Sequence, residues 1–245
     1  MIEARDLAPV TPLDPDAGPV TVLIEESTPS IAPELAEATE RRWAELLSEN
    51  PRHFDGPILA IERFDPSSNT IHARRDGYKR LAVQPEVETG VRILSVTGFI
   101  TAPDERSRPC VLLAQRSSAT RIYGGLWELA PSGGIDPPPS ATGSLDLDHV
   151  RTQLASELEE ELGIKPSVST ARPIALCVDG PGHSVDVVMR VDSGTPTGAL
   201  GVSIRDSWEY TGVRWLALNE APTFAREHAD ELIPSTREML RSGSS

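Results

Sequence analysis

Three glutamates, Glu157, Glu160 and Glu161, lie close together in an amphipathic segment, at a spacing that could bind a metal ion. The apolar residues of this segment recur every four positions and predict a helix with one buried face: Val150, Leu154, Leu158 and Leu162. Glu157 and Glu161 fall at the edge of that face, where an uncompensated carboxylate is costly. A hard divalent cation such as Mg2+ removes this cost, because it binds oxygen ligands and cancels their charge. The alternative is that these glutamates form a solvated acidic helix face. The spacing alone favours this alternative and the metal site equally.

Residues typical of helix ends flank this segment. Asp146 or Asp148 is expected to cap its start, because a carboxylate there accepts hydrogen bonds from the first free backbone amides. Gly163 is expected to end it, since glycine readily adopts the left-handed conformation found at helix C-termini. Glu159 falls well away from the apolar stripe and is expected to face solvent.

The same segment resembles the signature of the Nudix family, G-x5-E-x7-R-E-U-x-E-E-x-G-U, in which U is an aliphatic residue. The second half is matched in register by Glu157, Leu158, Glu160, Glu161, Gly163 and Ile164. Ser156 stands where the family has arginine, and Asp148 falls in the register of the first glutamate. The first half is longer here, because Gly134 precedes Ser156 by 22 residues (156 minus 134) instead of 14. The extra residues are expected in a proline- and glycine-rich loop over 137–144.

This resemblance implies a fold, a cofactor and a reaction. The fold is a mixed α/β (α+β) Nudix sandwich over residues 89–245, preceded by an N-terminal α/β extension over residues 1–88. The cofactor is Mg2+ or Mn2+, which the family's matching glutamates bind, here Glu157, Glu160 and Glu161. The reaction is hydrolysis of a nucleoside diphosphate linked to another group, by an activated water. These three residues are therefore the expected catalytic and metal-binding set.

Three short motifs outside the signature resemble a divergent Nudix branch that includes the UDP-glucose and UDP-galactose diphosphatase of animals. They cover residues 50–57, 78–80 and 208–213. They imply that the substrate is a UDP-sugar, cleaved to UMP and a sugar 1-phosphate, and they make Glu209 a further catalytic residue, ahead of Asp179. ADP-ribose or another nucleotide diphosphate is the enzymatic alternative. A module that binds a nucleotide without cleaving it is the other alternative, given Ser156 and the longer loop.

Five residues are candidates for substrate binding: Arg116, Tyr78, Lys79, Arg80 and Gly134. Arg116 directly follows a predicted strand, and a guanidinium group can bind two phosphate oxygens at once. Residues 78–80 belong to a cationic cluster with two interpretations. It is either an exposed strand end with counter-charges, or a wall that holds a diphosphate and stacks on a base. Gly134 is the glycine of the family signature.

Composition restricts the class of partner. The chain has 245 residues with 23 basic and 37 acidic side chains, a net charge of −14 and a pI near 4.8. Such acidity argues against nucleic-acid binding through a general basic surface. Cys110 and Cys177 lie in apolar runs and are expected to be reduced core residues. Without a signal peptide or a long apolar run, the chain is expected to be cytoplasmic, without a membrane partner, as a monomer or homodimer.

The remaining elements alternate between strands and helices, which indicates a mixed α/β architecture. Residues 1–20 are expected to be a loose lead-in, and residues 194–201 a flexible loop. A helix is expected over 33–50, two short helices over 222–241, and disorder at the C-terminal Ser-Gly-Ser-Ser. Strands are expected over 20–24, 58–64, 70–75, 91–100, 110–115, 173–178, 185–191 and 209–218.

Overall fold

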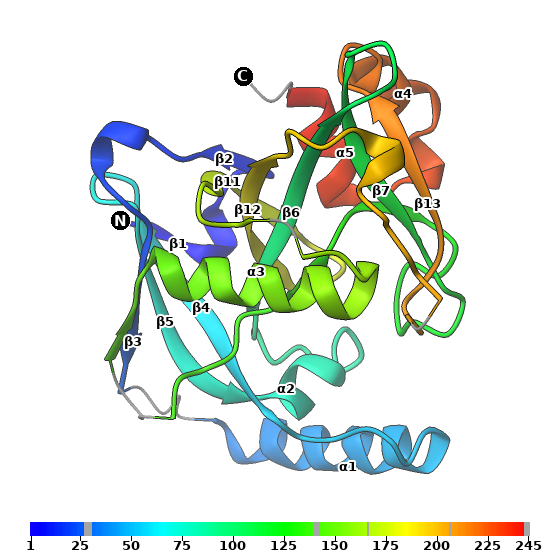
Figure 1. Cartoon of the computed structure of the whole chain (residues 1–245). Helices are drawn as coiled ribbons and strands as arrows, with labels where there is room; N and C mark the ends of the chain where they lie inside the picture. Colours follow the sequence, from blue (N-terminus) through cyan, green and yellow to red (C-terminus); the bar gives the residue numbers. More distant parts are fainter. Residues whose placement is uncertain (27–30, 140–142, 166, 206, 243–245) are drawn as a thin grey trace.

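A computed structural model describes residues 1–26, 31–139, 143–165, 167–205 and 207–242 (Figure 1). Its centre is a large mixed sheet, and within the described residues the main path of strands runs β10-β3-β5-β4-β6-β12-β11-β2. Strand β1 pairs with β4, β9 with β6, and β7 with β6, β8 and β13. The strands are β1 (Ile2–Glu3), β2 (Val10–Pro12), β3 (Thr21–Glu25), β4 (Pro57–Asp65), β5 (Thr70–Gly77), β6 (Ile93–Pro103), β7 (Pro109–Arg116), β8 (Trp127–Leu129), β9 (Ser132–Gly134), β10 (Gly143–Leu145), β11 (Arg172–Asp179), β12 (Ser184–Asp192) and β13 (Tyr210–Ala217).

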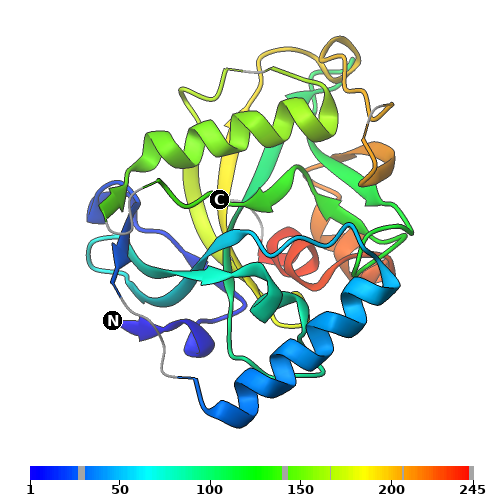
Figure 2. The ribbon, with the colours of Figure 1, turned by 90° about the horizontal axis from the view of Figure 1, so that it is seen from below.

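Five α-helices surround this sheet in the described part of the chain: α1 (Pro33–Glu49), α2 (Tyr78–Ala82), α3 (Leu147–Leu162), α4 (Ala221–Glu227) and α5 (Pro234–Ser242). Helix α3 crosses one face of the sheet, whereas α1 lies apart from α3 and packs on α2 (Figures 1 and 2). Helix α5 packs against β2, β8 and β11. None of the described helices is long and apolar enough to cross a bilayer. The mixed α/β fold expected from the sequence is thus confirmed.

Strand β6 organises the sheet, because it pairs with β4, β7, β9 and β12. Its pairing with β12 is parallel, with Val187 opposite Val96. Nine consecutive residues of β6 are buried, from Leu94 to Ala102. Such a continuous buried run is typical of a strand that is covered on both faces. The end of β6 near Ile93 is where the candidate site forms.

Helix α3 has the caps and the buried face that its sequence predicts. The Asp146 carboxylate accepts hydrogen bonds from the backbone amides of Asp148 and His149, so Asp146 is the N-cap. Gly163 ends the helix in the left-handed conformation, with φ of 66°. The four apolar residues spaced by four are fully buried in the main core. This face fixes the rotation of the helix and therefore the directions of its glutamates.

The N-terminal segment is not the loose lead-in that its prolines predict. Strand β2 pairs with β11, and the Asp14–Gly18 turn packs beside it. Leu7 and Leu13 are buried in the main core. Prolines are tolerated there because β2 lies at the end of the strand order, where a missing amide breaks no inner ladder. The prediction for residues 1–20 is therefore wrong.

The longer loop of the family signature also returns to the sheet. Its last residues form β10, which pairs antiparallel with β3, with Gly143 opposite Ile24. The sequence predicts a loop up to residue 144, so this short strand was missed. A three-residue strand whose partner lies more than a hundred residues earlier leaves no local periodicity to detect. Residues 140–142, which belong to the same loop, and residues 243–245 of the Ser-Gly-Ser-Ser end lie outside the described residues.

The expected boundary at residue 88 does not interrupt the packing. Phe64 and Ile71 from the first segment share the main core with Leu94 and Val187 from the second. Strand β4 also pairs with β6 across that boundary. The described residues of both segments contribute to the same main core. The division into an extension and a family domain therefore stays a prediction.

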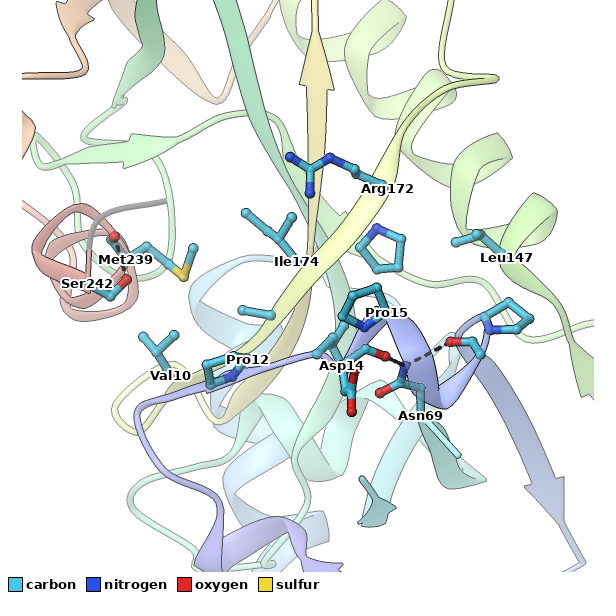
Figure 3. Close-up of a pocket in the computed structure, with 15 residues that line it drawn as sticks. Val10, Pro12, Asp14, Pro15, Asn69, Leu147, Arg172, Ile174, Met239 and Ser242 are labelled. Carbon is cyan, nitrogen blue, oxygen red and sulfur yellow. Dashed lines mark hydrogen bonds between the residues drawn. The ribbon is translucent and has the colours of Figure 1, made fainter. Parts of the chain in front are cut away.

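A buried asparagine connects the N-terminal turn to the β4–β5 hairpin. The Asn69 side-chain amide donates hydrogen bonds to the backbone oxygens of Asp14, at 2.6 Å, and Gly18, at 2.8 Å (Figure 3). Asn69 has a φ of 48°, a conformation that asparagine tolerates better than most residues. We expect Asn69→Ala to lower the free energy of unfolding by about 1–3 kcal/mol, because two buried acceptors lose their donor.

Urea denaturation would measure this effect. Asn50→Ala is the matched control, because Asn50 is exposed and its side chain accepts a bond only from the nearby amide of Arg52. We expect the control to change the unfolding free energy by less than about 0.5 kcal/mol. Equal stabilities of the two variants would contradict a structural role for Asn69.

Candidate functional site

A cavity of about 270 Å³ lies between α2, the start of β6, strand β9 and the β11–β12 turn. Of the residues singled out from sequence, it is lined by Tyr78, Arg116, Gly134, Asp179 and Glu209. Polar and apolar side chains both line it, and the aromatic ring of Trp208 among them is strongly exposed. The structure thus brings together residues that are far apart in sequence. Helix α3 presents its glutamates beside this cavity, through contacts with β9 and Glu209.

A larger cavity of about 570 Å³ lies elsewhere, between the N-terminal turn, β11 and α5 (Figure 3). Its lining is mainly apolar, with side chains such as Val10, Ile174 and Met239. Arg172 and Asp14 are its charged residues, and they come from different segments around it (Figure 3). None of the residues predicted to carry chemistry lines this cavity. Size alone therefore does not select the site.

Glu157 approaches the backbone of β9 closely. A Cβ atom at position 133 would collide with the Glu157 carboxylate, so a larger residue there would displace that carboxylate from β9. The Gln153 side-chain amide donates a hydrogen bond of 2.9 Å to Glu157 Oε1. Burial raises the pKa of Glu157, and the nearby carboxylates of Glu160 and Glu209 raise it further. The glycine strand and this glutamate therefore form one wall.

Glu161 is the most buried of the three glutamates, with 7% of its surface exposed. Its carboxylate accepts a hydrogen bond of 3.2 Å from the Ser132 amide and shares a second one with the Glu209 carboxyl group. Burial and the Glu209 charge raise the pKa of Glu161 far above its usual range. The two side chains therefore lie close enough for the Glu209 charge to disfavour ionisation of Glu161. The helix and the segment before β13 thus converge on one acidic pair.

Glu160 and Glu159 are both exposed, but their surroundings differ. Glu159 forms an ion pair with Lys165 on the solvent side of the helix, as its place away from the apolar stripe predicts. Glu160 lies near enough to Glu157 to raise the pKa of that group. Of the two exposed glutamates, Glu160 therefore contributes to the acidic field of the site.

The donor set fits a hard divalent cation in type and charge. All the candidate ligand atoms are carboxylate oxygens, which Mg2+ prefers. A bound cation would also remove the electrostatic repulsion between these carboxylates. Within the described ranges, no three acidic, histidine or cysteine side chains already converge as a metal-binding cluster. The carboxylate of Glu161 instead bonds to Glu209. The side chains of these glutamates must therefore rotate to share one ion.

Arg116 lines the cavity but is engaged with the protein. Its Nη1 atom lies 2.6 Å from Glu128 Oε1, and Nε donates to the Ile122 backbone oxygen. Glu128 is buried and also accepts a bond of 2.9 Å from the Tyr210 hydroxyl. Burial raises the pKa of Glu128, while Arg116 opposes that shift. Arg116 thus neutralises a buried acid under the cavity.

The cationic cluster predicted around Tyr78 is divided by the structure. Tyr78 begins α2 and lines the cavity. Lys79 and Arg80 lie outside the lining, where Lys79 Nζ is 2.6 Å from Glu40 and Arg80 is 2.7 Å from Asp76. Arg80 is buried and does not lie at an exposed strand end. The charges of these two residues are balanced by neighbouring carboxylates.

Sequence reasoning missed two buried acids of the cavity, Glu128 and Asp186. Both are charged residues inside otherwise apolar strand segments, and that interruption was the available signal. Asp186 is buried, and burial together with the nearby Asp179 charge raises its pKa to about 7. Asp179 itself accepts a hydrogen bond of 2.6 Å from the Tyr123 hydroxyl. Acidic side chains from β8, β11 and β12 therefore line the cavity.

Comparison with known proteins shows the family to which the chain belongs. The family model described as the NUDIX domain matches residues 91–236, so the chain belongs to the Nudix family. This family supports a hydrolase acting on phosphoanhydride bonds, and Nudix hydrolases generally use divalent metal ions such as Mg2+. A comparison with curated proteins yields no significant match.

Several solved structures are similar to part of the chain. The Nudix hydrolase RenU from M. smegmatis has 19% identity and a TM-score of 0.43, over 60% of this chain and 81% of its own. A Nudix hydrolase from Alicyclobacillus acidocaldarius has 12% identity and a TM-score of 0.48, over 62% and 90%. The NUDIX domain of Shewanella oneidensis NrtR, solved with ADP ribose, has 20% identity and a TM-score of 0.40, over 60% and 87%.

Asp186 should make the protein less stable as the pH rises. The Asp186 carboxyl group binds its proton more tightly in the folded state than in the unfolded state. Its contribution to the free energy of unfolding is therefore complete below about pH 4 and decreases as the pH rises from about 4 to about 7. One pKa unit is about 1.4 kcal/mol, so Asp186→Asn should raise the unfolding free energy at pH 8 by up to about 4 kcal/mol.

Urea denaturation at several pH values would measure this difference. Asp65→Asn is the control, because Asp65 is in a surface turn and its pKa is lowered by hydrogen bonds from Ser67. The free energy of unfolding of the control should decrease between about pH 4 and pH 7 as that of the wild type does. If Asp186→Asn shows the same decrease as the wild type, Asp186 is ionised without cost in the folded protein.

Proposed function

We propose that this protein hydrolyses a nucleoside diphosphate linked to a further group, with Mg2+ or Mn2+ as cofactor. The observation that carries this proposal is that Glu157 lies against Gly133 while Glu161 accepts a hydrogen bond from the Ser132 amide, so two glutamates of α3 contact the same strand, β9. Burial raises the pKa of both glutamates and the nearby Glu209 charge raises it further, so their ionised forms are costly without a cation. A bound cation and an anionic diphosphate would balance the charges together.

Each part of the site has a role in this proposal. Glu157, Glu160 and Glu161 would hold the ion, which when bound supplies charge neutralisation and a more acidic water. Gly133 and Gly134 present backbone without side chains, so a diphosphate can approach the carboxylates closely. Glu209, whose charge raises the pKa of the nearby Glu161, would accept the proton of the attacking water at a carboxylate oxygen. Arg116 keeps Glu128 neutralised beneath them.

For the substrate we propose a UDP-sugar, cleaved to UMP and a sugar 1-phosphate. The support is that Tyr78, Trp208 and Glu209, from two of the three short motifs shared with the UDP-sugar branch, line one cavity. The relatives named above include no UDP-sugar diphosphatase, and the ligand in the NrtR structure is ADP ribose. Hydrolysis of ADP-ribose is therefore the alternative within the same chemistry.

The glutamates of α3 should be essential for turnover and dispensable for folding. We expect Glu157→Gln, Glu160→Gln and Glu161→Gln each to lower kcat by at least about 100-fold. A neutral amide binds the cation more weakly than a carboxylate and does not neutralise its charge. Glu159→Gln is the matched control, since Glu159 is on the solvent side of the same helix. Steady-state kinetics with circular dichroism would test this, and unchanged kcat in all three variants would refute the site.

A substrate panel separates the candidate functions. UDP-glucose, UDP-galactose, ADP-ribose, NADH, diadenosine polyphosphates and dNTPs would each be incubated with Mg2+, with monophosphate release followed by chromatography. We expect UDP-sugars to be cleaved, the reaction to stop with EDTA and to resume with excess Mg2+. Cleavage of ADP-ribose alone would keep the chemistry and discard the UDP-sugar. Nucleotide binding without cleavage of any compound would indicate a binding module.

A further inference from the structure

The geometry points to a base-stacking subsite formed by Trp208 and Tyr78 at the mouth of the cavity. This inference deepens the proposed function and rests on it. Its ligand is the planar aromatic base of a nucleotide whose phosphates lie at the carboxylate wall. The two aromatic residues come from segments far apart in the chain, one just before β13 and one at the start of α2.

The size of the cavity requires a second binding surface. Ligand pockets usually measure about 300–1,000 Å³, and this cavity of about 270 Å³ is below that range. It suits a diphosphate with its ion, but a base and two further groups need more room. Part of the substrate must therefore extend over the rim, and the groups at the rim decide which part binds there.

Trp208 is the exceptional residue at that rim. Among the described residues, four large hydrophobic side chains are strongly exposed: Met1, Leu23, Phe54 and Trp208. Of these, only Trp208 lines the cavity, and 67% of its surface is exposed. The indole ring of Trp208 borders the cavity and is exposed to solvent. Its flat apolar face is therefore left uncovered by the described residues of the chain. Nucleobases stack on such faces.

The backbone that carries Trp208 is held in place. The Ser207 hydroxyl accepts hydrogen bonds from the Glu209 and Tyr210 amides, at 3.2 and 3.3 Å. The Glu209 backbone oxygen accepts a bond of 2.6 Å from the Ser117 amide. Trp208 thus directly precedes a residue of the carboxylate wall on an anchored turn. A base stacked on it would be near the phosphates of the same molecule.

Tyr78 supplies the other aromatic side of the cavity. Its ring packs edge-on against Trp43, with centroids 6.4 Å apart, and its backbone amide donates a 2.8 Å bond to the Gly56 oxygen. The ring is half-buried, so it cannot rotate freely yet still borders the cavity. The N-terminal segment therefore takes part in substrate binding. Stacking tolerates every base, so uracil and adenine should bind with similar affinity at this subsite.

Calorimetric titration with UMP and with ribose 5-phosphate, which lacks the base, tests this subsite without any turnover. Base stacking is worth about 1–3 kcal/mol, so Trp208→Ala should weaken UMP binding by about 5- to 150-fold. Ribose 5-phosphate binding should not change. Trp208→Phe should retain most of the UMP affinity, and AMP should respond to Trp208→Ala as UMP does.

Phe54→Ala is the matched control, because Phe54 is 76% exposed and outside the cavity lining. It should bind UMP as the wild type does. Tyr78→Leu keeps an apolar contact with Trp43 and removes the aromatic face, so it should weaken UMP binding several-fold. Circular dichroism would confirm that each variant is folded.

Three outcomes would overturn the subsite: no UMP binding by the wild type, UMP affinity unchanged in Trp208→Ala, or equal loss of UMP and ribose 5-phosphate. A change of oligomeric mass in Trp208→Ala with unchanged UMP affinity would instead assign the indole to a protein contact. If no panel compound is cleaved but UMP binding depends on Trp208, the hydrolase proposal fails and the subsite stands.

Discussion

The balance of charge around one cavity is the constraint on which this structure depends. Carboxyl groups from β8, β11, β12 and the segment before β13 line it, those of α3 lie beside it, and burial raises the pKa of several of these groups. Arg116, which is partly buried and lines the cavity, is already paired with Glu128. Such an arrangement is costly for the isolated protein. A cationic partner would lower this cost, as the proposed metal-dependent function requires.

The backbone makes this arrangement possible at two positions. The caps of α3 and its buried apolar stripe set which helix positions face β9. Gly133 then lets the Glu157 carboxylate approach the strand more closely than any side chain would permit. The positions of the glutamates of α3 are therefore set by apolar side chains that pack in the core, away from the carboxylates. The stability of the fold thus depends on other residues than the chemistry of the site.

The sequence was sufficient for local features and insufficient for distant pairings. The α3 periodicity, its Asp146 cap and its Gly163 end were predictable, because each depends on residues within a few positions. The pairing of β2 with β11, and the burial of Glu128 and Asp186, depend on residues far away in the chain. No pattern in a single strand encodes its partner. The proline content of residues 1–20 was misleading for the same reason.

The strand pairings of the N-terminal segment have a consequence for how the chain folds. Strand β2 waits for residues 175–177 and β3 for residues 143–145, so both are synthesised long before these partners exist. Closing such long loops costs entropy before any contact compensates for it, which slows folding. Strand β1 pairs with β4 and β3 with β5, so these two strands find partners within the segment that ends at Gly77. Strand β2 is therefore among the last parts of the chain to reach its native contacts, although the ribosome makes it early.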